Sequence, residues 1–134
     1  MSSQAPRAVV AGHAGFAAAM VEVVARIAGK ADALLAVSND GLDARGVEDA
    51  ITGALKRHGA NVVFTDLPAG SVAIAARRAA HTDPSIAIVT GTTAAMLLDF
   101  VLGEATDAPA LERCAARGRE SIVVHAAKEG MRAD

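Results

Sequence analysis

Short apolar runs alternate with longer helical patterns along this chain, and no other feature constrains its fold as strongly. Strands that alternate with helices in this way form a parallel sheet with crossover helices. We therefore expect an α/β domain. The predicted strands are Ala8–Ala11, Ala33–Val37, Asn61–Thr65 and Ile86–Val89, followed by a last apolar strand at Ser121–His125.

Helical patterns occupy the stretches between these strands. Gly29 is placed to end the first helix as a left-handed C-cap, and Asp43 is placed to cap the second. No repeat divides the chain, so we expect one domain over residues 1–134, with flexible ends at 1–6 and 127–134. The predicted helices are Ala14–Ala28, a second from about Asp43 to His58, Ser71–Ala80, Thr93–Leu102 and Ala110–Arg117.

Composition limits both the core and the partners of the chain. Hydrophobic residues make up 52% of the 134 residues but aromatic residues only 2%, so the core must consist of Ala, Val, Ile and Leu. The formal net charge is -2, and there is no basic block or aromatic platform, which argues against a nucleic-acid partner. No apolar run reaches the roughly 18 residues of a membrane helix. We expect a cytoplasmic protein.

The single cysteine, Cys114, supports the same compartment. One cysteine cannot form an intramolecular disulfide, and this usage suits a reducing cytoplasm. Cys114 lies in a helical pattern, and we interpret it as a small buried hydrophobe rather than a nucleophile.

Two turns each place one reactive side chain just after a predicted strand. His13 lies in the turn of Val9–Phe16, and Asp66 lies in the turn of Phe64–Ser71. The carboxyl ends of parallel strands open onto one crevice, so turns from neighbouring strands can bring these groups together. We therefore expect His13 and Asp66 to meet.

An imidazole oriented by a carboxylate beside a helix N-terminus can accept a phosphoryl group. The carboxylate of Asp66 would fix the tautomer of His13 and leave the other ring nitrogen free to attack. Gly12 and Gly15 allow close approach of the backbone, and the helix N-terminus favours an anion such as phosphate. The hydroxyl of Ser71, with the N–H groups of Ala69 and Gly70, could hydrogen-bond phosphoryl oxygens.

Simpler interpretations stay open for each of these residues. His13 can be a solvated turn residue, Asp66 a helix cap or turn residue, and Ser71 an ordinary N-cap. The Gly-His-Ala-Gly sequence lacks the third glycine of a Rossmann fingerprint and the Lys-Ser/Thr of a nucleotide P-loop, so no nucleotide cofactor is predicted. No other His or Cys lies at ligand spacing from His13, so no metal site is predicted.

The turns resemble those of the mannose-family enzyme IIA of the bacterial phosphoenolpyruvate-dependent sugar phosphotransferase system. The resemblance covers about Val9 to His125 and rests on Gly-His-x-Gly after the first strand and Asp-Leu-x-x-Gly-Ser after the third. Thr-Gly-Thr before Met96 and Gly-Arg-Glu-Ser at 118–121 add support.

This resemblance implies an open, mostly parallel sheet of strand order 2-1-3-4, with helices on both faces and a fifth, antiparallel edge strand exchanged in a homodimer. It implies that His13 is phosphorylated on Nε2 while Nδ1–H bonds to Asp66, and that Gly70 and Ser71 contact the phosphoryl group. The donor would be the phosphocarrier protein HPr and the acceptor an enzyme IIB component. The membrane would be reached only indirectly, through a permease.

Three other functions compete with this one. The phosphotransfer subunit of dihydroxyacetone kinase also uses a His after strand one and an Asp after strand three, but its second turn is shorter. A response-regulator receiver needs an acidic pair after the first strand, where this chain has Gly12 and His13. A non-catalytic regulatory protein-binding module remains open. Whatever the function, an uncovered apolar final strand would favour dimerisation.

Overall fold

The computed structural model describes residues 6–127, and within them the chain forms a parallel sheet of four strands with the order β2-β1-β3-β4. Every pairing is parallel, as the alternation of strands and helices predicted. β1 lies centrally and pairs with β2 on one side and β3 on the other. The strands are β1 (Ala8–Gly12), β2 (Leu34–Ser38), β3 (Val62–Thr65) and β4 (Ala87–Val89).

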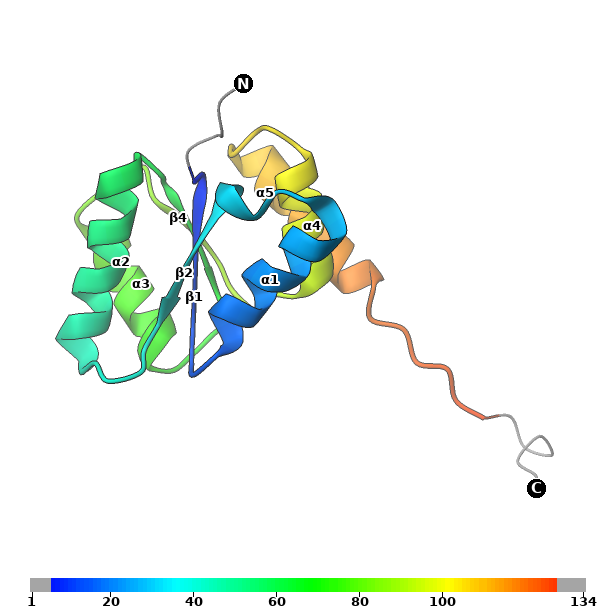
Figure 1. Ribbon diagram of the computed structural model, residues 1–134, viewed down its shortest axis with the longest axis horizontal. Coiled ribbons are helices and arrows are strands. Elements are labelled where there is room, and N and C mark those ends of the chain that lie inside the picture. Colours follow the sequence, from blue (N-terminus) through cyan, green and yellow to red (C-terminus); the bar gives the residue numbers. More distant parts are fainter. Residues whose placement is uncertain (1–5, 128–134) are drawn as a thin grey trace.

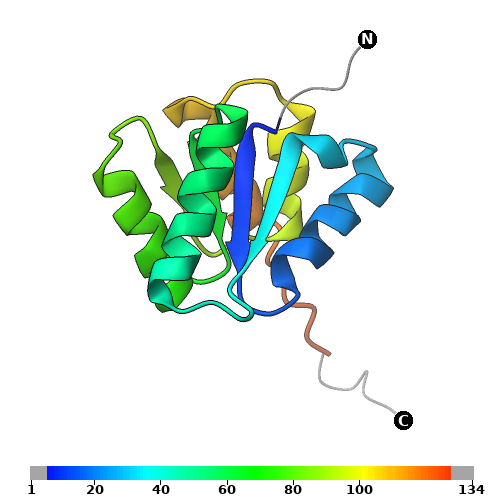
Figure 2. The same ribbon diagram turned by 60° about the vertical axis from the view of Figure 1, so that its left-hand side comes forward.

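Helices cover both faces of this sheet (Figure 1 and Figure 2). One face carries α2 (Ala44–His58) and α3 (Ser71–His81). The opposite face carries α1 (Phe16–Ala28), α4 (Ala94–Leu102) and α5 (Ala108–Glu120), and a short 3-10 turn (Ala31–Ala33) precedes β2. This is the predicted α/β arrangement.

β1 is buried along its whole length because both of its faces are covered. Successive side chains of a strand point to opposite faces. Ala8 and Val10 therefore pack against the layer of α1, α4 and α5, whereas Val9 and Ala11 pack against α2 and α3. The core is largely aliphatic, as the composition required. It also contains the edge-to-face pair Phe64 and Phe100, whose ring centroids lie 5.1 Å apart.

The predicted helix ends are confirmed at Gly29 and Asp43. Gly29 has a φ of 69°, in the left-handed region, and its N–H donates to Ala25 O. Asp43 accepts a hydrogen bond from Gly46 N at 2.8 Å. The predicted start of the first helix at Ala14 is wrong, however, because the φ of Ala14 is 51° and α1 begins only at Phe16.

The C-terminal region differs most from the prediction. α5 is longer than expected because Asp107 caps its start, accepting from Ala110 N at 3.1 Å. In this chain taken alone, residues 122–127 form no strand and are exposed, so the strand expected at Ser121–His125 stays a prediction. A strand needs a neighbouring strand to pair with, and this segment projects away from the sheet (Figure 1). The predicted flexible ends lie almost wholly outside residues 6–127.

Two further predictions concern burial. Cys114 is fully buried and donates to Asp99 Oδ2 at 3.2 Å. Burial, together with Asp99, raises the pKa of the Cys114 thiol to about 12, so the thiol is an inert core group as expected. Among the described residues, no helix combines the length and apolarity needed to cross a bilayer.

Candidate active site

His13 and Asp66 meet at the carboxyl end of the sheet. His13 directly follows the last residue of β1, Asp66 directly follows the last residue of β3, and the two strands are paired with Ala11 opposite Thr65. The ring Nδ1 of His13 lies 2.8 Å from Asp66 Oδ2, and the backbone N–H of His13 donates to the same oxygen at 2.8 Å. The winding of the sheet reverses at β1, which is where α/β proteins bind ligands.

Asp66 is held as a carboxylate. Burial alone would raise the pKa of Asp66, but hydrogen bonds from the backbone and ring of His13, the charge of that ring and the N–H of Leu67 together hold the pKa below its ordinary value. Leu67 N donates to Oδ1 at 2.9 Å, so both carboxylate oxygens accept hydrogen bonds. In the neutral ring, an ionised acceptor at Nδ1 requires that Nδ1 carry the single ring proton, which leaves a lone pair on Nε2.

Ser71 lies on the outer side of the imidazole. Its hydroxyl oxygen is 3.4 Å from His13 Nε2. Ser71 is the first residue of α3 but not its N-cap: that position belongs to Gly70, whose φ of 102° is one that favours glycine. The simpler interpretation of Ser71 as an N-cap is therefore wrong. The unpaired N–H groups of the first turn of α3 lie beside the ring, where they favour an anion.

Two buried threonines make hydrogen bonds that hold the turn carrying Asp66. Thr65 Oγ1 donates to Leu67 O at 2.9 Å, and Thr92 donates to Thr65 O through Oγ1 at 2.7 Å and through N at 3.1 Å. These are the buried polar residues of the described chain. Their roles were not predicted from the sequence, although a threonine ending an apolar strand was a signal that could have pointed to them.

A second unpredicted contact involves Ala14, next to the histidine. Asn39 Oδ1 accepts from Ala14 N at 3.1 Å, and Ser38 Oγ donates to Ala14 O at 2.8 Å. The sequence indicated only a turn at Ser38–Gly41. Gly12 has a separate packing role, because a Cβ there would lie 2.6 Å from the Phe16 ring.

The other histidines are not part of this site. His58 and His81 end α2 and α3, the positions where an imidazolium complements the helix dipole. Within residues 6–127 no group of three or more His, Cys, Asp or Glu side chains is arranged to hold a metal ion.

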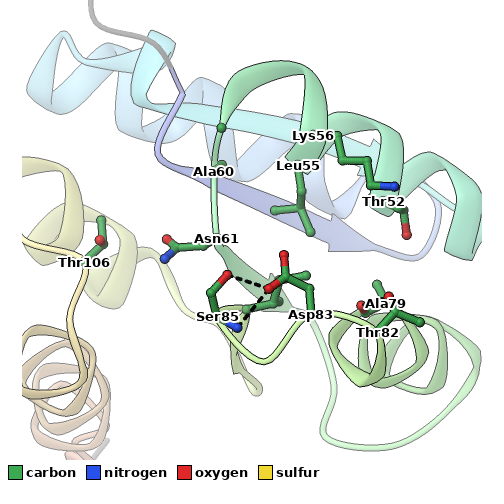
Figure 3. Close-up of a pocket in the computed structure, with 12 residues that line it drawn as sticks. Thr52, Leu55, Lys56, Ala60, Asn61, Ala79, Thr82, Asp83, Ser85 and Thr106 are labelled. Atoms are coloured by element: carbon green, nitrogen blue, oxygen red, sulfur yellow. Dashed lines mark hydrogen bonds between the residues drawn. The ribbon is translucent and has the colours of Figure 1, made fainter.

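Hollows in the surface lie both at the site and away from it. A groove of about 370 Å³ between α2 and α3 reaches Ser71 and is lined also by Arg45, Ile74 and Arg78. A cavity of about 470 Å³ lies at the opposite end of the sheet, where α2 and α3 end and β3 and β4 begin (Figure 3). Its Asp83 carboxylate accepts from the backbone and hydroxyl of Ser85.

The fold and the site together define a doubly wound α/β domain with a carboxylate-oriented histidine at its switch point. The family model described as PTS system fructose IIA component, where PTS is the phosphotransferase system, matches residues 7–117. The chain belongs to this family, as the two turns predicted.

Solved structures of the same class share the fold. The phosphotransferase component EIIA from Streptococcus agalactiae has a TM-score of 0.79 at 18% identity, covering 88% of this chain and 95% of that one. The mannose/sorbose-specific IIA subunit from Enterococcus faecalis has a TM-score of 0.78 at 19% identity, covering 94% and 98%. The IIA protein associated with the fucose utilization operon of Streptococcus pneumoniae has a TM-score of 0.74 at 21% identity, covering 92% and 96%. No curated protein matches the chain.

Proposed function

We propose that the chain carries a phosphoryl group on His13, taking it from phosphorylated HPr and passing it to an enzyme IIB component. The observation that carries this proposal is the pair formed by His13 Nδ1 and Asp66 Oδ2 at 2.8 Å. The side chain of His13 is 40% exposed, whereas that of Asp66 is 10% exposed. The nucleophilic nitrogen can therefore meet a partner protein while its orienting carboxylate stays shielded.

The transfer step needs neither a metal ion nor a base to balance its bonds, protons and charge. The Nε2 lone pair of His13 attacks the phosphorus of the donor's phosphohistidine, and a new N–P bond forms as the old one breaks. The donor's ring leaves as a neutral imidazole because its second nitrogen already carries a proton. The positive charge moves onto the His13 ring, where Asp66 accepts the Nδ1–H bond and stabilises the charge. Passage to the acceptor is the same step in reverse.

Gly70 and Ser71 hold the phosphoryl oxygens in this proposal. In the free protein the Ser71 hydroxyl faces Nε2 at 3.4 Å, so it must turn by a bond rotation to donate to an incoming oxygen. The Gly70 backbone and the first turn of α3 supply N–H groups and a positive dipole end beside it.

A second copy of the chain would complete the sheet. Ile122, Val123 and Val124 are 73%, 61% and 85% exposed, and they form an extended apolar segment. β4 pairs only with β3 among the described residues, and a groove of about 590 Å³ runs along its other side. Residues 121–125 of one copy would pair antiparallel with β4 of the other, giving a homodimer in which the β4 edge of each sheet is covered.

Size-exclusion chromatography with light scattering tests this dimer. We expect a dimer at micromolar concentration, and a monomer after the change Val123→Asp. The matched change Ile27→Asp, at another exposed apolar residue on α1, should leave the dimer intact. A monomeric parent protein would contradict the exchange.

A phosphorylation assay tests the function itself. With enzyme I, HPr and phosphoenolpyruvate, the protein should acquire an acid-labile label that a mannose-family IIB domain removes. The label should vanish in His13→Ala and persist in His81→Ala, a histidine at the far end of α3. Acid-stable label would contradict the proposal, and the absence of any label would contradict it and favour a non-catalytic binding module. The reaction belongs in the cytoplasm, with the membrane reached only through a permease that the IIB component serves.

A further inference from the structure

Ala14 is strained, and it directly follows the proposed phosphoryl acceptor. Among the described residues it is the non-glycine residue with a positive φ, at 51°. This region is unfavourable for an L-residue because Cβ approaches the following carbonyl oxygen. Such a conformation persists only where the surrounding structure enforces it, and such residues cluster at functional sites.

The strain lies in a tight turn that starts at the histidine. His13 O accepts from Phe16 N at 3.1 Å, so residues 13–16 form a hydrogen-bonded turn. Gly15 has φ -88° and ψ 9°, and together with the positive φ of Ala14 these angles match a type II′ turn, in which glycine dominates the position that Ala14 fills. The sequence itself therefore does not favour this turn at residue 14.

The turn after β2 supplies the missing support. Asn39 Oδ1 accepts from Ala14 N, and Ser38 Oγ donates to Ala14 O, so both polar groups of the strained residue are held. Ser38 is itself placed by the β1–β2 register, opposite Gly12, and Asn39 N donates to Gly12 O at 3.2 Å. Asp66 holds residue 13 from β3, while Ser38 and Asn39 hold residue 14 from β2.

We propose that Ser38 and Asn39 are positioning residues for phosphoryl transfer: they keep Ala14 in its left-handed conformation and so aim Nε2 of His13 outward, beside Ser71. Without them, residue 14 relaxes to an ordinary backbone conformation and the peptide that joins it to His13 swings. The ring then loses its alignment with Asp66. The kinetic part of this inference rests on the proposed phosphoryl transfer, whereas the orientation of the ring does not.

The first test measures the rate at which phosphorylated HPr labels the protein. Asn39→Ala and Ser38→Ala should each slow labelling by roughly tenfold, since small misplacements of a reacting group are costly. Ser38→Thr, which keeps the hydroxyl, should label almost normally. Asn61→Ala removes the same type of side chain at the opposite end of the sheet and should have no effect.

The second test asks whether the strain at Ala14 is the reason that labelling depends on Asn39. Glycine adopts a positive φ freely, so a chain with Ala14→Gly no longer needs the two side chains to hold the turn. Asn39→Ala should therefore slow labelling far less in the Ala14→Gly background than in the parent. An equal loss in both backgrounds would show that Asn39 acts by another route and would overturn the proposal.

The third test does not depend on phosphoryl transfer. In a protein with nitrogen-15-labelled histidine, NMR reports the tautomer of His13, with His58, His81 and His125 as internal references. The parent should show the proton on Nδ1. Asn39→Ala combined with Ser38→Ala should give a mixture of tautomers, and the further change Ala14→Gly should restore the parent pattern. If the protein takes up no phosphate at all, the proposed function fails but this spectrum still decides the proposal. An unchanged tautomer in the double variant overturns it.

Discussion

Asp66 holds His13 by its backbone and by its ring at once, through a single carboxylate oxygen. Oδ2 accepts from the His13 backbone N–H and lies against ring Nδ1, both at 2.8 Å, while Oδ1 accepts from Leu67 N. The position and the rotation of the imidazole are therefore fixed by the same group. This arrangement makes the role of Asp66 easy to test, because both of its carboxylate oxygens accept hydrogen bonds.

Asp66→Asn should slow phosphoryl transfer by at least about a hundredfold, because an amide has one acceptor oxygen where the carboxylate has two. If the amide oxygen faces His13, the NH2 group faces the N–H of Leu67. If the amide turns over, NH2 faces Nδ1 and forces the ring proton onto Nε2, which blocks the nucleophile. The rate of labelling by phosphorylated HPr measures the effect.

The same substitution should lower the free energy of unfolding by only about 2 kcal/mol, the usual contribution of a hydrogen bond to a charged group. Asp83→Asn is the control, since Asp83 accepts two hydrogen bonds where Asp66 accepts three, but lies in the turn before β4. A large loss of stability with unchanged transfer per folded molecule would show that Asp66 is only a turn residue.

The stabilisation that Asp66 provides should depend on pH in one direction. Its pKa is lower in the folded chain than in the unfolded one, where it is near 3.8, so the unfolded chain binds the proton first. The contribution is fully present above the unfolded value and is lost as pH falls through the folded value. Urea unfolding of the parent and of Asp66→Ala should therefore differ most above about pH 5, and the difference should shrink as the pH falls below the unfolded-state pKa. A difference that grows on acidification would contradict this.

Ser71→Ala should have a smaller effect than Asp66→Asn. The loss of one hydrogen bond to the charged phosphoryl group corresponds to about 2 kcal/mol, or about a thirtyfold slower transfer. Ser71→Thr keeps the hydroxyl and should stay close to the parent rate. Equal rates in all three proteins would show that the hydroxyl does not contact the transferred group. Stability should change little, because Ser71 does not cap α3.

Gly118→Ala tests the packing of α5 on α4. A Cβ at this position would lie 2.6 Å from Met96 Cγ and 2.8 Å from Met96 Sδ. The overpacking outweighs the gain in helix propensity, and we expect a net loss of about 1 kcal/mol in the free energy of unfolding. Gly53→Ala, in α2, meets only the flexible end of Arg57 and should gain up to about 1 kcal/mol instead. Urea denaturation of both variants measures the contrast.

The parallel sheet and the meeting of His13 with Asp66 could be predicted because they depend on signals local to each turn, whereas the strand order was expected only from the family resemblance. An apolar run followed by glycine marks the end of a strand, and parallel strands bring such ends together. Gly29 and Asp43 were predictable for a similar reason, since helix caps have strong residue preferences.

The hydrogen bonds that support Ala14 and Thr65 from other turns could not be predicted in this way. Asn39 supports Ala14 across 25 positions of sequence, and Thr92 supports Thr65 across 27. The sequence of either turn alone does not indicate which distant residue contacts it. The start of α1 was missed because alanine, a strong helix former, is forced into a turn by those distant side chains. The final strand was assigned from its apolar residues, but the strand partner such a segment needs is absent from a lone chain.

The contrast in exposure between the imidazole and its carboxylate separates two stages that salt should affect differently. Ions in solution surround the outer nitrogen and the charged side chains of the groove that reaches Ser71, such as Arg45 and Arg78, and so weaken long-range attraction between the carrier and any charged partner. They do not reach Asp66 Oδ2, the shielded oxygen that lies against the ring Nδ1 of His13. Raising ionic strength should thus slow each encounter while leaving the chemistry within an encounter untouched.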